Sequence, residues 1–203
     1  MSQQPFRDPR YVEPRIDVEH REDGSIILRN PHPLRDPAPN LISPLRQWAG
    51  DAPDRVWLGK RKPAKEGFGD WDLLTYADAE KKVFAIGQAL IDRGFNQSTP
   101  VMILSGNSIE HALMSYGAIL AGAPATPVSP SYSTISTDFE KLRYVFDLVE
   151  PKMIFMQESA PFERALTALP LDGVELVTVD GSLGTPFADL LATRSGAGAE
   201  ARF

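Results

Sequence analysis

The chain of 203 residues contains no cysteine, so disulfide bonds, thiolate catalysis and cysteine-based zinc sites are all excluded. It has only three histidines, and no spacing of His, Asp and Glu resembles a metal site. The chain has a formal charge of −6, and its acidic and basic residues are interspersed. It has no basic stripe that would neutralise nucleic-acid phosphates. These absences exclude nucleic acid as a partner and predict no metal ligands.

Long apolar runs are also missing. The longest, Ala112–Val128, is interrupted by Tyr116, glycines and prolines, and a bilayer span needs roughly 20 apolar residues. The first fifteen residues are polar and proline-containing, unlike a secretory leader. We therefore expect no membrane segment and a cytoplasmic location.

Most of the chain reads as strands alternating with helices. From Thr75, apolar strands near 101–104, 123–128, 152–156 and 174–179 alternate with helical patterns. Such alternation predicts parallel strands joined by right-handed crossovers. We expect an α/β subdomain over residues 75–191, a flavodoxin-like doubly wound parallel sheet.

The flanking segments have different patterns. Residues 1–74 are predicted to form an N-terminal arm, with a hairpin around Asp23-Gly24, a proline-rich connector and one short helix capped by Ser43. Residues 192–203 have the composition of a flexible linker. Within that linker, Gly196–Ala201 matches the dinucleotide fingerprint, but no strand precedes it, so we reject a nucleotide site there.

Two helix starts carry capping signals. Thr75 with Asp78 forms a capping-box pattern, and Asn107 with Glu110 forms a second one. The strand end Ser105–Ser108 also offers backbone N–H groups to an anion or a carboxylate. We prefer the interpretation that Asn107 simply caps its helix.

The histidines suggest little chemistry. His20 and His32 fall in the hairpin and the connector, where we expect them to be solvated. His111 lies close to Ser105 and Ser108, but a serine–histidine–aspartate triad needs a matched acid and an exposed serine elbow. The sequence shows neither, so we predict no catalytic residue in this chain.

Four segments resemble one enzyme family. Leu74-Thr-Tyr-Ala-Asp78 and Leu120–Ser129 (LAGAPATPVS) are similar to the first two core motifs of AMP-forming adenylating enzymes. The closer resemblance is to feruloyl-CoA synthetases. It extends over nearly the whole chain and is strongest at Leu104–Leu113 (LSGNSIEHAL) and Pro127–Tyr132 (PVSPSY). The sequence does not contain the Ser/Thr/Gly-rich loop with which that family holds ATP.

The resemblance implies that this chain is an incomplete, N-terminal portion of the large domain of an acyl-CoA synthetase. The whole enzyme would use ATP, Mg²⁺ and CoA to activate an aromatic acid such as ferulate through an acyl-adenylate. None of these cofactors is expected to bind this chain tightly, and the piece alone is expected to be inactive. By the same resemblance Arg164 is a candidate contact for a CoA phosphate, because guanidinium pairs with phosphate; an exposed surface arginine is the alternative.

The partners implied are the acid, ATP, CoA and the remainder of the same polypeptide. Because the arm would cover segments that this chain lacks, we also expect an exposed apolar patch and self-association. Two other interpretations stay open. One is a non-catalytic, flavodoxin-like binding or regulatory module, and the other is a purely structural part of an assembly.

Overall fold

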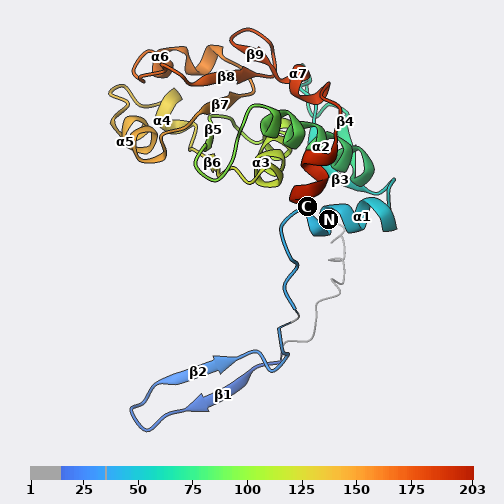
Figure 1. Cartoon of the computed structure of the whole chain (residues 1–203). Coiled ribbons are helices and arrows are strands. Elements are labelled where there is room, and N and C mark those ends of the chain that lie inside the picture. Colours follow the sequence, from blue (N-terminus) through green and yellow to red (C-terminus); the bar gives the residue numbers. More distant parts are fainter. Residues whose placement is uncertain (1–14, 35) are drawn as a thin grey trace. The chain divides into compact units, whose positions relative to one another are not determined.

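The computed structural model describes residues 15–34 and 36–203 and divides into two compact units, Met1–Pro37 and Ala38–Phe203. Figure 1 shows the strands and helices of both units. Each unit is described by itself, and the functional groups discussed below belong to the second.

The first unit contains the predicted hairpin. Strands β1 (Asp17–His20) and β2 (Ile26–Arg29) pair antiparallel around Gly24, which has φ = 81°. On one face the Glu19 carboxylate contacts the guanidinium groups of Arg21 and Arg29. The opposite face carries four apolar side chains that are each more than half exposed, Ile16, Val18, Ile26 and Leu28, together with His20.

The second unit begins with helix α1 (Ser43–Asp51) and an antiparallel ribbon of β3 (Val56–Arg61) and β4 (Trp71–Thr75). The predicted cap of α1 is wrong. The Asn40 side-chain oxygen, rather than that of Ser43, accepts from the N–H groups of Ile42 and Ser43, at 2.9 and 2.8 Å. The bonds to Asn40 order the turn before α1, whereas Ser43 is itself the first helical residue and Ile42, at the cap position, makes no side-chain bond.

A five-stranded parallel sheet forms the centre of the second unit, with the order β6-β5-β7-β8-β9. All four strand pairs are parallel, so the predicted α/β class is confirmed. Numbered from the first strand of the sheet, this order is 2-1-3-4-5, which is that of flavodoxin-like folds. The strands are β5 (Val101–Ile103), β6 (Ala125–Pro127), β7 (Met153–Met156), β8 (Glu175–Thr178) and β9 (Thr185–Pro186).

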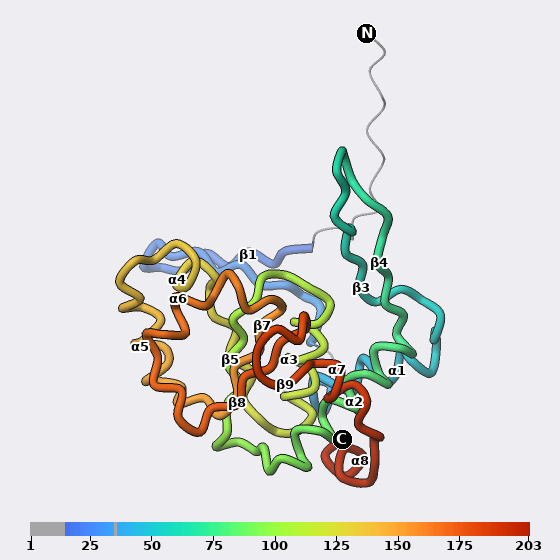
Figure 2. The backbone as a smooth tube through the Cα atoms, turned by 90° about the horizontal axis from the view of Figure 1, so that it is seen from above, coloured from blue at the N-terminus to red at the C-terminus, as the bar shows by residue number. Residues whose placement is uncertain are grey.

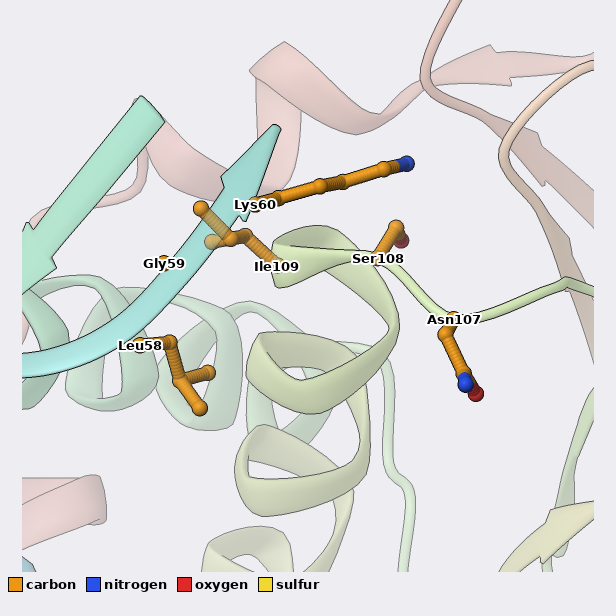
Figure 3. A pocket seen from close by; sticks show the side chains of 6 residues that line it. All are labelled: Leu58, Gly59, Lys60, Asn107, Ser108 and Ile109. Atoms are coloured by element: carbon orange, nitrogen blue, oxygen red, sulfur yellow. The ribbon is translucent and has the colours of Figure 1, made fainter. Parts of the chain in front are cut away.

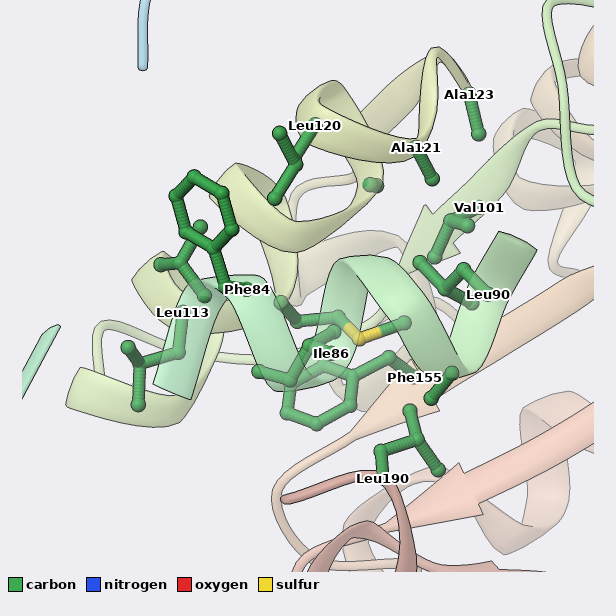
Figure 4. Packing of buried hydrophobic residues seen from close by; sticks show 14 of the residues in the cluster. Phe84, Ile86, Leu90, Val101, Leu113, Leu120, Ala121, Ala123, Phe155 and Leu190 are labelled. Atoms are coloured by element: carbon green, nitrogen blue, oxygen red, sulfur yellow. The ribbon is translucent and has the colours of Figure 1, made fainter. Parts of the chain in front are cut away.

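Helices cover both faces of the sheet. The first face packs against α2 (Tyr76–Asp92), α3 (Ile109–Ala121) and α7 (Phe187–Leu191), and the second against α5 (Glu140–Val149) and α6 (Glu163–Leu166). Successive side chains of a strand point to opposite faces. Val101 and Ile103 therefore join the first core cluster, part of which Figure 4 shows, whereas Met102 joins the second.

In the first layer of helices, the predicted cap at Thr75 is confirmed, and the second long helix ends at a glycine. The Thr75 hydroxyl accepts from the Asp78 N–H at 3.2 Å and caps α2. Gly122 ends α3 in the left-handed conformation, with φ = 76°. A side chain at that φ would be strained, which is why a glycine stops the helix there.

The second layer is more broken than the sequence pattern predicts. The pattern indicates a single helix over 135–149, but the structure has α4 (Ser131–Thr134), an irregular turn and then α5. The Ser136 hydroxyl donates to Asp138 and accepts from the Phe139 N–H, so local side-chain bonds replace the helical ones. The helix indicated over 161–169 is likewise short, formed by the 3-10 turn η1 (Ala160–Phe162) and α6.

Residues predicted as a flexible linker contain a helix instead. Helix α8 (Ala197–Arg202) lies beside α2 (Figure 2), and its Ala199 is fully buried. The Gln88 side chain accepts from the Ala199 N–H at 2.9 Å. The Arg46 guanidinium stacks on the Phe84 and Phe203 rings and pairs with Glu200 at 2.7 Å. Tertiary contacts therefore order a segment whose composition alone favours a linker.

Within residues 15–34 and 36–203, none of the helices combines the length and apolarity that crossing a bilayer requires.

Candidate functional site at the carboxyl edge of the sheet

The candidate site lies where the strands β5 and β7 end. The chain leaves β5 for β6 on one side and returns to β7 on the other, so the strand order reverses between them. Open α/β sheets bind ligands in the crevice outside the carboxyl ends of the strands at such a point. The loops that follow these two strands therefore contain the first residues to consider.

The turn from β5 into α3 brings together the serines and the histidine singled out in the sequence. Ser108 caps α3, because its hydroxyl accepts from the His111 N–H at 3.0 Å. The prediction that Asn107 is the cap is therefore wrong by one residue. The Ser105 side chain is buried and donates to the Gly106 carbonyl at 3.1 Å.

His111 also bonds to the Gly106 carbonyl, through Nδ1 at 3.1 Å. A carbonyl oxygen can only accept, so the proton of a neutral imidazole lies on Nδ1 and leaves Nε2 as an acceptor. In the part of the chain that the structure describes, no carboxylate bonds to His111. A catalytic triad is thus not assembled here.

A small pocket of about 190 Å³ lies between this turn and strand β3. Figure 3 shows Lys60 extending past Ser108, while the Asn107 side chain points away from the strand. The lysine places a positive charge beside the N-terminus of α3, which itself carries a partial positive charge. Sequence reasoning did not single out Lys60, because β3 and α3 are distant in sequence and only the packing of the ribbon brings them together.

A second polar group follows β7 and β8. The Ser182 hydroxyl donates to the Asp180 carboxylate at 2.7 Å, and the buried Ser159 hydroxyl lies 2.7 Å from that of Ser182. Since Ser182 uses its proton on Asp180, Ser159 donates to Ser182. The bond from Ser182 holds the pKa of the Asp180 carboxyl below its usual value. The only signal in the sequence was the Asp-Gly-Ser turn after a strand.

Arg164 lies apart from these groups, on α6. It is exposed, and its guanidinium carbon stands 5.8 Å from the centroid of the Phe139 ring. The described residues give it no carboxylate partner. The side chain is thus available to an anion from solvent.

The remaining candidates offer no chemistry. His20 and His32 are exposed, as predicted. Gly196 does precede a helix, α8, but α7 rather than a strand lies before it, so the dinucleotide fingerprint lacks its context. No three His, Asp or Glu side chains among residues 15–34 and 36–203 lie together as a metal site.

Three solved structures share this fold. They are the fatty acyl-adenylate ligase from L. pneumophila in complex with acyl adenylate and pyrophosphate (16% identity, TM-score 0.55), a benzoate CoA ligase from Burkholderia xenovorans (15%, 0.57) and the inhibitor-bound N-terminal domain of FACL13 from Mycobacterium tuberculosis (22%, 0.56). The matches cover 78%, 78% and 77% of this chain, in the same order. They cover only 26%, 29% and 36% of the chains in the three solved structures. The α/β fold is that of the N-terminal domain of adenylating enzymes, of which the chain forms a part.

Two sequence comparisons agree with the fold. A mycosubtilin synthase polypeptide from Bacillus subtilis is 26% identical over 113 residues, which are 54% of this chain and 4% of that protein. The profile described as "AMP-binding enzyme" matches residues 45–198, from α1 through the start of α8. With three quarters of its length matched to that profile, the chain belongs to the AMP-binding enzyme family.

Proposed function

We propose that this chain belongs to an ATP-dependent, AMP-forming acid:CoA ligase whose acid is a hydroxycinnamate such as ferulate. In the first half-reaction the carboxylate attacks the α-phosphorus of ATP, forming the acyl-adenylate and releasing pyrophosphate. In the second, the CoA thiol attacks the acyl carbon, the thioester forms and AMP leaves. The protein would work in the cytoplasm.

The observation that carries the proposal is the family match over residues 45–198, combined with the four motif segments. The match supports adenylate chemistry. The hydroxycinnamate is supported by the resemblance of Leu104–Leu113 and Pro127–Tyr132 to feruloyl-CoA synthetases. Both of these segments border the carboxyl edge of the sheet, where ligands bind in this fold class.

In this proposal the residues of the chain act mainly as scaffold. The groups that hold ATP and Mg²⁺ come from the remainder of the polypeptide, since the chain covers 26–36% of the three solved structures compared above. Magnesium would balance the phosphate charge in the whole enzyme, and no residue of this chain is assigned to it. We therefore propose that the 203-residue chain alone forms no adenylate.

Pyrophosphate exchange into ATP tests the proposal directly. The longer protein should catalyse exchange that depends on ferulate, and the 203-residue chain should catalyse none. Benzoate and a long-chain fatty acid serve as competing acids. Exchange with benzoate or the fatty acid but not with ferulate would contradict the proposed substrate. Exchange catalysed by the 203-residue chain would contradict the proposal that this chain alone is inactive. Saturable ligand binding at Ser105–Ser108, with no exchange by the longer protein, would favour a binding module instead.

Arg164 has a separate test, because CoA enters only in the second half-reaction. If its guanidinium contacts a CoA phosphate, Arg164→Gln in the longer protein should raise the KM for CoA by about tenfold, the size of one charge-assisted bond. Ferulate-dependent exchange should stay unchanged. Lys152→Gln is the matched control, since Lys152 is an exposed cation at the opposite, amino edge of β7. An unchanged KM in Arg164→Gln would remove the residue from the CoA site.

A further inference from the structure

A second cavity lies away from the candidate site, between the first half of α2 and the segment that follows α7. Its volume is about 470 Å³, within the range of small-molecule sites. Figure 2 shows α2, α7 and α8 next to one another around this segment. The residues that line the cavity are Asp78, Lys81, Lys82, Ala85, Leu191, Ala192, Thr193, Arg194 and Ser195.

The charged groups that line this cavity are mostly positive. Lys81, Lys82 and Arg194 face it together with one carboxylate, that of Asp78. None of the three cations forms an ion pair within the described residues, whereas Arg46 and Arg93 both do. Asp78 is one helical turn before Lys82, but no ion pair joins them. Three cations and a single carboxylate therefore leave the lining of this cavity with an excess of positive charge.

The same cavity offers uncharged donors. The Ser195 hydroxyl lines it, and the amide N–H groups of Arg194 and Ser195 bond to no acceptor in the described part of the chain. The loop turns from α7 towards α8 at this point, so its backbone is not part of a helix. Cations combined with free hydroxyl and amide donors match the oxygens of phosphate, which accept several hydrogen bonds at once.

We propose that this cavity binds a small phosphate-bearing anion, through Lys81, Lys82 and Arg194 with the hydroxyl and amide donors of the 193–195 loop. The ligand is a phosphoanion with at least two negative charges, because Asp78 offsets one of the three cations and leaves a net charge of about +2. The shared chemistry fits both a free pyrophosphate and the phosphates of a nucleotide. Binding here uses only this chain and does not depend on the ligase activity.

The test measures binding to the 203-residue chain by isothermal titration calorimetry at low ionic strength, with inorganic pyrophosphate and ATP as separate probes. We expect saturable binding of at least one of them, weakened by added salt because the contacts are partly exposed. Pyrophosphate alone would identify a free phosphoanion, and ATP alone would identify a nucleotide. Succinate is the control for charge without phosphate, and we expect it to bind more weakly.

Variants that remove a cation and a variant that removes the carboxylate should act in opposite directions. Lys82→Gln and Arg194→Gln should each weaken binding by about threefold or more, whereas Asp78→Asn should tighten it, because a repelling carboxylate is removed. Lys152→Gln, far from the cavity, should change nothing, and thermal unfolding of each variant checks its fold. The absence of saturable binding, or equal weakening in Lys82→Gln and Lys152→Gln, would overturn the proposal.

Discussion

Gly117 of α3 lies so close to Ile86 of α2 that a β-carbon on residue 117 would stand 2.3 Å from Ile86 Cγ2. On the other side of the same crossing, a β-carbon on Gly87 would stand 2.7 Å from Leu120 Cδ2. The two glycines let the helices that cover the first face of the sheet approach closely. The packing of α2 on α3 in turn positions the turn that contains Ser108 and His111.

This contact predicts opposite effects for two glycine substitutions. Gly117→Ala should lower the free energy of unfolding by about 1–3 kcal/mol, because the stiff Ile86 side chain cannot move aside. Gly50→Ala, in helix α1 with open space around it, should raise it by about 0.5–1 kcal/mol through helix propensity. Urea unfolding of both variants measures the difference. Equal effects would show that the close approach of α2 and α3 is not a constraint.

The correction of the α3 cap gives a second prediction. Ser108→Ala should destabilise the fold by about 1 kcal/mol, because the His111 N–H loses its acceptor. Asn107→Ala should change the stability by less than about 0.5 kcal/mol, as for other exposed surface positions. Chemical denaturation of the two alanine variants measures this directly. A larger loss of stability in Asn107→Ala than in Ser108→Ala would show that Asn107 caps α3, as inferred from the sequence.

A buried hydrogen bond from Ala199 to Gln88 contributes to the docking of α8. Gln88→Ala removes the acceptor of the Ala199 N–H and leaves this buried group unsatisfied, at a cost of about 1–3 kcal/mol. We expect faster hydrogen exchange in residues 197–202 and less change in the sheet. Gln47→Ala is the matched control, because its side chain bonds only to exposed Asp51. Unchanged exchange in α8 would mean that the stacking of Arg46 holds the helix by itself.

Asp180 predicts a pH dependence of stability. The Ser182 hydroxyl, as the main cause, lowers the pKa of the folded carboxyl below the ordinary value of 3.8. A group whose folded pKa is lowered stabilises the fold above its unfolded pKa, and this contribution disappears as the pH falls through the folded value. Ser182→Ala should therefore be less stable than the wild type near neutral pH, with a difference that shrinks below pH 3.8.

The control for this prediction is Ser159→Ala, which loses the bond to Ser182 but keeps the bond from Ser182 to Asp180. Its loss of stability should not depend on pH in the acid range. Unfolding in urea at a series of pH values compares the two variants. A constant difference between Ser182→Ala and the wild type across this range would show that the hydrogen bond does not act through the carboxylate.

Self-association remains a prediction, and the hairpin of the first unit supplies a specific surface for it. Val18 and Leu28 are cross-strand partners on its exposed apolar face. Light scattering should detect association that grows with concentration, and the double variant Val18→Thr, Leu28→Thr should reduce it, because less apolar surface is exposed. Ile135→Thr, an exposed apolar residue of the second unit, is the control. A monomer at every concentration would contradict the prediction.

The sequence alone determined the features that depend on neighbours along the chain. The hairpin at Asp23-Gly24, the cap at Thr75 and the stop at Gly122 all follow from local backbone preferences, and the apolar strands indicated a parallel sheet. The family resemblance also came from contiguous motifs. Each of these signals lies within a few residues, so no knowledge of distant contacts is needed.

Only the tertiary structure decided which distant groups meet. Lys60 reaches the start of α3 because the ribbon packs there, and Lys82 and Arg194 share a cavity because α7 leads the chain back to α2. Helix α8 forms in a glycine-rich segment because Gln88 and Arg46 bind it, which offsets a weak intrinsic helix propensity. Contacts between residues far apart in sequence depend on the packing of the whole fold, so local sequence patterns do not predict them.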